Sequence, residues 1–347
     1  MKICLYADNH YSQYSSIVRK RGNRYSHRLE NQIASLDWVE SLAAYTGCDE
    51  IVCLGDFFDK SQLNSEEITA LQEITFDSNI MHTFIVGNHE MLGNYFSSAH
   101  LFTLSNNFQV VDQVMCKHSG KSIIYYIPYI LECNREELSK YFIADNKGKQ
   151  IIVLTHNDIK GIQMGQFVSK EGFDIDDISQ NCDLFINGHL HNGQAVTNKI
   201  INLGNLTGQN FSEDASRWAH CAAVLDTETL HIDYYENPCA YNFYKMNLTL
   251  VNRDVGIAAI DKLKNNAVVT AKVYEKDYDY FKAYFNECAD KIEAFKLIIE
   301  SEEVVNSSDD SIEDLLSIDH IEQFKVFCSE QLGNSDIVLQ ELAEVTK

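Results

Sequence analysis

The sequence lacks a long apolar run. No stretch of about 18 consecutive apolar residues occurs, and that is the length a helix needs to cross a bilayer. The first residues, Met1-Lys2-Ile3-Cys4-Leu5, lead directly into a strand and lack the design of a signal peptide. We therefore expect a soluble, intracellular protein that has no membrane partner.

Basic side chains are also few: 28 Lys and Arg stand against 51 Asp and Glu, which gives a net charge of −23. This balance argues against indiscriminate DNA binding through a basic surface. It does not exclude a nucleic-acid enzyme whose metal ions and partner subunit supply positive charge. The one basic cluster comprises Arg19, Lys20, Arg21, Arg24 and Arg28. It is either a solvated entry to a helix or a loop that faces phosphate, and both interpretations stay open.

Paired cysteines are absent, because none of the ten cysteines forms a Cys-x-x-Cys pair. Several lie in apolar, strand-like runs, which indicates buried, reduced thiols. The chain has only two prolines and shows no internal repeat. With 347 residues, 45% of them hydrophobic, it can bury a sizeable core, and we expect two compact units.

The first 90 residues alternate between strand and helix patterns. Apolar runs of strand length occupy residues 3–6, 51–54 and 83–86, and residues 27–45 show helical spacing of apolar positions. Asn64 followed by Glu67 resembles a capping box that opens a second helix. The order β-α-β-α-β predicts an α/β sheet with helical crossovers.

The middle of the chain is richer in strands. Short apolar runs near residues 122–126, 151–154, 184–186 and 200–203 predict further strands, and residues 134–142 a short helix. Two strand patterns flank Asp226-Thr227-Glu228-Thr229, which predicts a hairpin. After residue 240 the pattern is strand, helix, strand, helix, strand, typical of a small α+β unit.

Polar side chains follow five of the predicted strands at the points where the strands end. In chain order these are Asp8-x-His10, Gly55-Asp56-x-x-Asp59, Gly87-Asn88-His89-Glu90, His156, and Gly188-His189-x-His191. Residues at i and i+2 of an extended segment point the same way, so each paired end can present two side chains to one metal. A single such end could reflect turn chemistry alone. Five together favour a metal site.

The kinds of ligand atom in these motifs narrow the choice of metal. Carboxylates, imidazoles and one amide oxygen, without a thiolate, suit Mn²⁺, Fe or Zn²⁺. Seven ligands are too many for one tetrahedral zinc ion but suit two ions roughly 3.5–4 Å apart that share a carboxylate. One histidine must then be kept off the metals to protonate a leaving oxygen.

The order of these motifs over residues 8–191 resembles the calcineurin-like metallophosphoesterase superfamily. The resemblance implies an α/β fold in which a two-sheet sandwich is flanked by helices. It implies that one metal is held by Asp8, His10, Asp56 and His191, and the other by Asp56, Asn88, His156 and His189. His89 would be the general acid, and Asp59 the carboxylate that orients its ring. The expected cofactors are two divalent metal ions, with Mn²⁺ favoured.

Within the superfamily the chain is most similar to the SbcD-type nucleases of double-strand-break repair and their tailed-phage counterparts. Ile127-Pro128-Tyr129 and Gly204-Asn205 support this branch, as does the Phe57-Phe58 pair inside the second motif. Lys60-Ser61 stands where Ser/Thr phosphatases have Arg-Gly, which speaks against them. Glu90 stands where the branch commonly has Asp, so the role of this residue stays open.

This branch also implies a modular organisation. We expect a metallophosphoesterase (nuclease) domain at 1–240, a small capping domain at 241–301, an acidic linker at 302–311, and a C-terminal helical segment at 312–347. The expected partners are DNA, an SbcC-like coiled-coil ATPase and a second copy of the chain. The expected location is the cytoplasm of a bacterial cell, with the chain encoded either by the bacterium or by a phage. The apolar stripe that would bind the ATPase, or else pack on its own domain, is Ile312, Leu315, Leu316, Phe324 and Phe327.

The leading hypothesis is therefore a Mn²⁺-dependent DNA nuclease with exonuclease and single-strand endonuclease action, controlled by the ATPase. The alternative is another calcineurin-like phosphodiesterase or phosphatase that acts on nucleotides or phosphoproteins. A non-catalytic scaffold is disfavoured because both His89 and Asp56 are present.

Overall fold

The structure, a computed structural model, describes residues 1–14, 24–74, 76–77, 79–92, 96–104, 107–164 and 167–301. Residues Met1–Ser301 form one compact unit. The predicted acidic linker and C-terminal helical segment lie outside the described residues, as do Arg19, Lys20 and Arg21 of the basic cluster. Among the helices that the structure describes, none combines the length and apolar character needed to cross a membrane.

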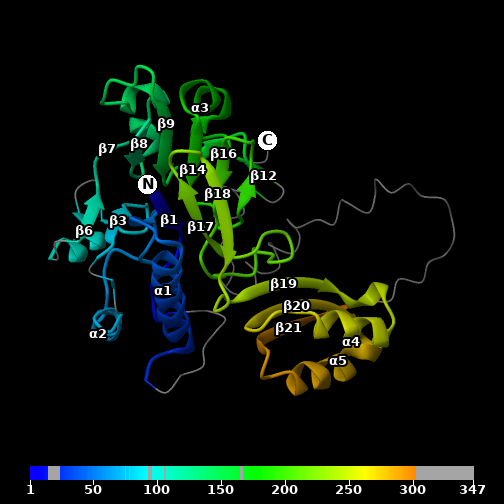
Figure 1. The fold of residues 1–347 in the computed structure, drawn as a ribbon. Helices are drawn as coiled ribbons and strands as arrows, with labels where there is room; N and C mark the ends of the chain where they lie inside the picture. Colours follow the sequence, from blue (N-terminus) through cyan, green and yellow to red (C-terminus); the bar gives the residue numbers. More distant parts are fainter. Residues whose placement is uncertain are drawn as a thin grey trace, which may run out of the picture. The chain divides into compact units, whose positions relative to one another are not determined.

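Two six-stranded sheets form the centre of the fold (Figure 1). The first has the order β18-β17-β1-β2-β3-β6, with bounds His231–Glu236, Cys221–Asp226, Lys2–Tyr6, Glu50–Cys53, Met81–Ile85 and Phe108–Val111. The second has the order β15-β16-β14-β9-β8-β7, with bounds Gln194–Ala195, Ile200–Asn202, Leu184–Asn187, Gln150–Thr155, Ser122–Ile127 and Met115–Ser119. The predicted fold class is confirmed.

Parallel strands occupy the middle of both sheets. β1, β2, β3 and β6 run parallel in the first, and β8, β9, β14 and β16 run parallel in the second. The edge strands β7, β15 and β18 pair antiparallel with their neighbours. β17 and β18 form the predicted hairpin, whose last turn residue, Leu230, has φ 61°. The carboxyl ends of the parallel strands therefore lie at one edge of each sheet.

Side chains alternate between two cores along these strands, as the period-2 geometry of a strand requires. Ile3 and Leu5 of β1 are buried against residues of the second sheet, such as Ile152 of β9. Cys4 and Tyr6 of β1 face the opposite way, into a core shared with the helices. The sheets are thus buried on both faces, which explains the continuous apolar runs in their strands.

Helices cover the outer faces of both sheets. α1 (His27–Thr46) packs on the first sheet; Ser26 caps its start and Gly47, with φ 67°, ends it. α2 (Ser65–Leu71) begins with the predicted capping box of Asn64 and Glu67. α3 (Ile175–Asn181) packs on the second sheet through Ile178.

Minor elements complete this part of the fold. Three two-stranded pairs are formed by β4 (Met91–Leu92) with β5 (Phe96–Ser97), β10 (Ile159–Lys160) with β13 (Phe173–Asp174), and β11 (Gln163–Met164) with β12 (Phe167–Val168). The short 3₁₀ helices are Ser98–Leu104, Glu132–Asn134, Leu138–Tyr141 and Leu248–Leu250. Glu132–Asn134 and Leu138–Tyr141 replace the single helix predicted for residues 134–142, and neither has a side-chain N-cap to stabilise its start.

A smaller sheet follows residue 240. Its strands β19 (Asn242–Asn247), β20 (Ala267–Tyr274) and β21 (Ile292–Glu300) are all parallel. Parallel neighbours need crossover connections, which are supplied by α4 (Arg253–Asp261) and α5 (Glu275–Glu287) on one face of the sheet (Figure 1). Phe281 and Phe285 of α5 form a separate core with these strands.

Candidate metal centre

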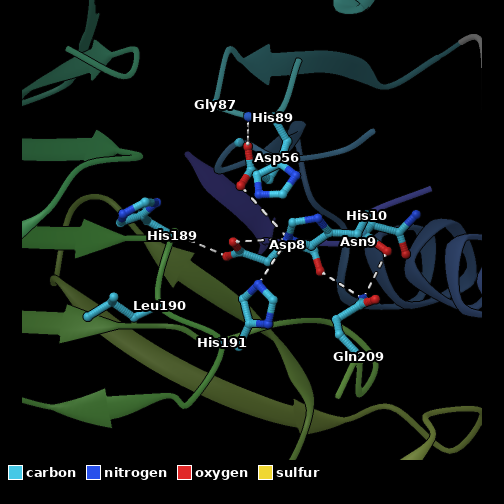
Figure 2. A network of polar contacts seen from close by, with 12 residues as sticks. Asp8, Asn9, His10, Asp56, Gly87, His89, His189, Leu190, His191 and Gln209 are labelled. Carbon is cyan, nitrogen blue, oxygen red and sulfur yellow. Dashed lines mark hydrogen bonds and ion pairs between the residues drawn. The ribbon is translucent and has the colours of Figure 1, made fainter. Parts of the chain in front are cut away.

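All nine predicted site residues follow the carboxyl ends of five parallel strands: β1, β2, β3, β9 and β14. Polar groups at such ends meet outside the sheet, where ligands bind in α/β folds. Figure 2 shows Asp8, His10, Asp56 and His191 turned toward a common centre. The structure thus brings together residues that are far apart in the sequence, such as His10 and His191, which 181 positions separate.

The backbone of this centre is held in an unusual conformation. Asp8, His10, Asp56 and His189 have φ between 46° and 75°. This left-handed region costs a non-glycine residue on the order of 1–3 kcal/mol, and it persists only where the surroundings enforce it. Here the first two motifs enforce it on each other, because Asp8 N–H donates to Gly55 O and His10 N–H to Asp56 O. Strain concentrated at four residues of one site indicates a functional constraint.

One cluster of donor atoms is formed by Asp8, His10 and His191, which come within metal-binding distance of one another. His10 donates its Nδ1–H to Asp59 Oδ1 at 3.3 Å, and His191 donates its Nδ1–H to Glu213 Oε1 at 3.0 Å. The proton of each neutral ring therefore lies on Nδ1, and each Nε2 atom has a lone pair that can bind a metal ion. These Nε2 atoms lie 3.0 Å apart.

A second cluster is formed by Asp56, Asn88, His156 and His189. His156 donates its Nδ1–H to Leu54 O at 2.8 Å, so Nε2 carries no hydrogen when the ring is neutral, and this atom faces Asn88 Oδ1 at 3.2 Å. His189 is turned the other way. Its Nε2–H donates to Asp158 Oδ1 at 3.0 Å, and its Nδ1, which carries no hydrogen, lies 3.1 Å from Asn88 Oδ1. In all four histidines the outward nitrogen carries the hydrogen, as in protein metal sites.

Asp56 joins the two clusters. Its Oδ2 lies 3.1 Å from His156 Nε2 and 3.8 Å from His10 Nε2. Burial opposes its charge, but His156, with His10 and His89, holds the pKa of this carboxyl well below its usual range. Conversely, burial disfavours a charged His156, yet Asp56 raises the pKa of that ring to about 10. Asp56 is therefore ionised at every physiological pH and is placed to bridge two ions.

The residues present fit two divalent cations. Asp8 Oδ1 is fully buried and has no hydrogen-bond partner, a costly arrangement for a carboxylate unless a cation compensates it. When both rings are neutral, the facing Nε2 atoms of His10 and His191 likewise hold lone pairs with no proton between them. Gly87 leaves room for Asp56, because a Cβ there would come within 2.2 Å of its Oδ1. Asp8, His10 and His191 would hold one ion, and Asn88, His156 and His189 the other, with Asp56 shared.

His89 lies beside these clusters: it is not part of the second one, but it comes within metal-binding distance of His10 and Asp59. Its ring packs edge-on against His10 with centroids 4.6 Å apart, and its side chain is 42% exposed. Its Nδ1 donates to the main-chain carbonyl of Asp59 at 2.9 Å, whereas Asp59 Oδ1 is 3.9 Å away. We expected the Asp59 carboxylate to orient His89. In the structure the Asp59 carbonyl does so, because the carboxylate accepts the His10 proton instead.

Glu90, whose role the sequence left open, joins two motif loops. Its side chain is fully buried, and its carboxylate accepts the N–H of Phe58 at 3.0 Å and of Gly87 at 2.7 Å. Burial and the nearby Asp56 raise the pKa of Glu90 to about 8, although the two N–H groups oppose that rise. Glu90 thus positions the loops that carry Asp56 and Asn88, with one carboxylate oxygen bonded to each loop.

Two further site residues were missed by sequence reasoning, and a third, Arg28, was predicted only as one member of the basic cluster. Glu213 is 1% exposed and orients His191; it belongs to no motif, so nothing in the sequence marked it. Asp158 Oδ1 accepts the Nε2–H of His189, and its place two residues after His156 was a signal that we did not use. Arg28 of the basic cluster is buried beside His10 and His89, whereas Arg24 is 63% exposed, as a solvated helix entry would be.

The chain is similar to a known protein family in sequence and to solved proteins in structure. The profile of the calcineurin-like phosphoesterase family matches residues 1–193. A dimetal phosphatase from Danio rerio is similar in structure, with a TM-score of 0.40 and 13% identity over 65% of this chain and 91% of that one. The phosphoesterase YfcE from E. coli gives a TM-score of 0.32 and 14% identity over 68% and 100%. No curated protein matches. Because the family profile spans more than half of its residues, the chain belongs to the calcineurin-like phosphoesterase family.

Proposed function

We propose that the chain is a dinuclear-metal DNA nuclease, which hydrolyses phosphodiester bonds as an exonuclease and as a single-strand endonuclease. The observation that carries the proposal is the exposure of the acid side of the site. His89 and Asp59 are 42% and 38% exposed, whereas the metal-binding carboxylates Asp8 and Asp56 are at most 2% exposed. The reacting phosphate can therefore lie at the surface, where a polymer can reach it.

The chemistry follows from the placement of the side chains. Two divalent cations held by the two clusters would supply a charge that polarises the phosphate and favours attack by water. His89 then protonates the leaving oxygen as the P–O bond breaks. The hydrogen bond from His89 Nδ1–H to Asp59 O fixes the ring so that Nε2 points away from that carbonyl. Asp56 Oδ1 accepts the main-chain N–H of His89 at 2.9 Å, which fixes the position of His89 relative to the metal-binding carboxylate.

The smaller sheet supports the SbcD-type branch. The loop that carries Glu213 is bonded to the first residues of this unit: Gly208 N–H donates to Tyr241 O at 3.0 Å, and Ala215 N–H to Phe243 O at 2.8 Å. The smaller unit thus adjoins the site, as a capping domain would. We extend the proposal to Mn²⁺ as the metal, to a homodimer, and to an SbcC-like ATPase that binds residues 312–347, which lie outside the described part of the chain.

The test is a cleavage assay with Mn²⁺ on linear duplex and circular single-stranded DNA, with and without the candidate ATPase. We expect the purified chain to shorten the duplex and nick the circle. The matched variants are His89→Ala and His231→Ala; His231 is 69% exposed and pairs with Asp233 outside the site. Hydrolysis of bis(p-nitrophenyl) phosphate without any DNA cleavage would exclude the nuclease and favour a phosphodiesterase or phosphatase that acts on smaller substrates.

A further inference from the structure

Arg28 places a positive charge beside the acid. It lies in the first turn of α1, and its side chain is 3% exposed. Its guanidinium donates from one nitrogen to Gly208 O at 2.8 Å and from the other to Gln209 Oε1. Both acceptors are neutral. A buried cation is normally neutralised by a carboxylate. Among the described residues Arg28 has no ion pair within 4 Å, and Glu213 and Asp59 act on its charge only from farther away, so its guanidinium can also bind an anion.

Arg28 keeps its charge at neutral pH. Burial lowers its pKa to about 10, and the carboxylates of Glu213 and Asp59 partly oppose that change. Gln209 holds the guanidinium in place, because its Nε2 donates to Thr207 O at 3.1 Å and Asn9 O at 3.2 Å while its Oε1 accepts from Arg28. The side chain is therefore charged and preorganised.

A cavity of about 280 Å³ connects Arg28 to the reacting groups. Its lining includes His10, His89 and His191 of the site together with Tyr14, Arg28 and Gln209. In an in-line displacement the attacking and leaving oxygens lie on opposite sides of phosphorus. Because His89 protonates the leaving oxygen, the rest of the leaving group must extend into the cavity that His89 lines.

Tyr14 gives this cavity an aromatic surface. Its side chain is 71% exposed, which is unusual for a large aromatic residue. The segment before it is pinned: Tyr14 N–H donates to Ser12 Oγ at 3.1 Å, and Ser12 Oγ–H donates to the buried Glu67 at 3.1 Å. An exposed ring on a backbone anchored in this way can stack on a nucleobase, which contributes about 1–3 kcal/mol per base.

We propose that Tyr14, Arg28 and Gln209 form a subsite for the leaving nucleotide. The ring of Tyr14 stacks on its base, and Arg28, oriented by Gln209, binds the phosphate one nucleotide beyond the scissile bond. This proposal rests on the proposed nuclease function and adds to it a requirement: good substrates carry a further phosphate on the leaving side. A lone phosphomonoester or a nitrophenyl diester does not meet it.

The kinetic test compares thymidine dinucleotides that carry no terminal phosphate, a 5′-phosphate or a 3′-phosphate. One of the two terminal phosphates belongs to the leaving nucleotide. We expect that one to raise kcat/KM about 10–100-fold, the gain from a charge-assisted hydrogen bond. Arg28→Met should remove this gain, and Arg28→Lys should restore part of it. Arg24→Met, at an exposed residue paired with Glu73, should leave the gain as in the wild type.

A binding measurement separates this subsite from the nuclease proposal. Thymidine 3′,5′-bisphosphate is titrated calorimetrically into the full chain loaded with Mn²⁺. We expect the dissociation constant to rise at least about tenfold in Arg28→Met and in Tyr14→Ala. Tyr45→Ala, which removes an aromatic ring that is 87% exposed on α1, should not change it. Failure of the wild type to bind, or equal binding by Arg28→Met, would overturn the subsite. Absence of DNA cleavage alongside normal bisphosphate binding would instead overturn the nuclease proposal.

Discussion

His10 and His191 face each other with their Nε2 atoms 3.0 Å apart, although 181 positions separate them in the chain. Each ring donates its other N–H to a carboxylate, so neither facing nitrogen carries a proton when the rings are neutral. Two bare lone pairs this close repel each other unless a cation lies between them. The folded backbone, which is strained at His10, holds the two rings at this distance. The fold itself therefore arranges the two histidines for metal binding.

Glu213→Gln should weaken metal binding without removing a metal ligand. Glu213 accepts the Nδ1–H of His191 and raises the pKa of that ring against the effect of burial, which makes Nε2 a stronger donor. Loss of such a partner typically lowers metal affinity about 10–100-fold. The affinity for Mn²⁺ is measured by calorimetric titration, with the exposed Glu136→Gln as the matched control. An unchanged affinity would show that Glu213 does not tune His191.

His89→Ala should retain both metals and lose most of the rate. A general acid contributes roughly 10²–10⁴-fold. His89 belongs to neither of the two clusters assigned to the ions, although it forms a third group with His10 and Asp59. The rate on a thymidine dinucleotide, whose alkoxide leaving group needs a proton, and the metal content are measured on the same preparation, with His231→Ala as the control. Loss of metal together with the rate would assign His89 to the metals and contradict its role as the acid.

The nine motif residues could be predicted because each depends on short-range order. A strand ends, a polar pair follows it, and parallel strands bring such ends to one edge. The contribution of Glu213 could not be predicted, because it depends on a loop placed by contacts with the smaller unit, such as Ala215 N–H to Phe243 O. The exchange at Asp59, where the carbonyl serves His89 and the carboxylate serves His10, depends on backbone direction, which residue type does not specify.

Glu50→Ala should destabilise the fold, because Glu50 joins the two large sheets. It begins β2 and is 1% exposed; its carboxylate accepts hydrogen bonds from Lys117 at 2.9 Å and from the Tyr126 hydroxyl at 3.0 Å, both in the second sheet. Removing Glu50 leaves the buried Tyr126 hydroxyl without this acceptor, which costs about 1–3 kcal/mol of unfolding free energy, whereas Lys117 is 38% exposed and can be solvated. Urea denaturation measures this.

The matched control for Glu50 is Glu236→Ala. Glu236 pairs with Lys264, and both side chains are more than 40% exposed. An exposed pair contributes about 0–1 kcal/mol. Equal losses in the two variants would mean that Glu50 does not hold the sheets together.

Stability should fall as pH rises through neutrality because of Glu40. Burial raises the pKa of this α1 carboxyl to about 7, although the Asp77 N–H opposes the rise. The folded state therefore binds the proton more tightly than the unfolded chain. Its contribution to stability is complete below the unfolded pKa of about 4.5, and it is lost as pH rises through 7.

Glu40→Gln isolates this effect, because its amide oxygen can still accept the Asp77 N–H. His82, 3.5 Å from Glu40, has a pKa lowered by burial, so its own contribution is constant above about pH 6.5. Urea midpoints are therefore compared between pH 6.5 and 8. We expect the wild type to lose stability over that window and the variant to lose less. Parallel curves would contradict the assignment.

The most direct test of the account is the number of metal ions that the chain binds. Mn²⁺ content is measured per chain after equilibration and desalting, for the wild type, for Asp56→Asn, and for Asp233→Asn at an exposed position. Because Asp56 is placed to bridge two clusters, we expect two ions in the wild type and in Asp233→Asn, and fewer in Asp56→Asn. A wild type that binds one ion or none, or an Asp56→Asn variant that still binds two, would contradict the dinuclear centre.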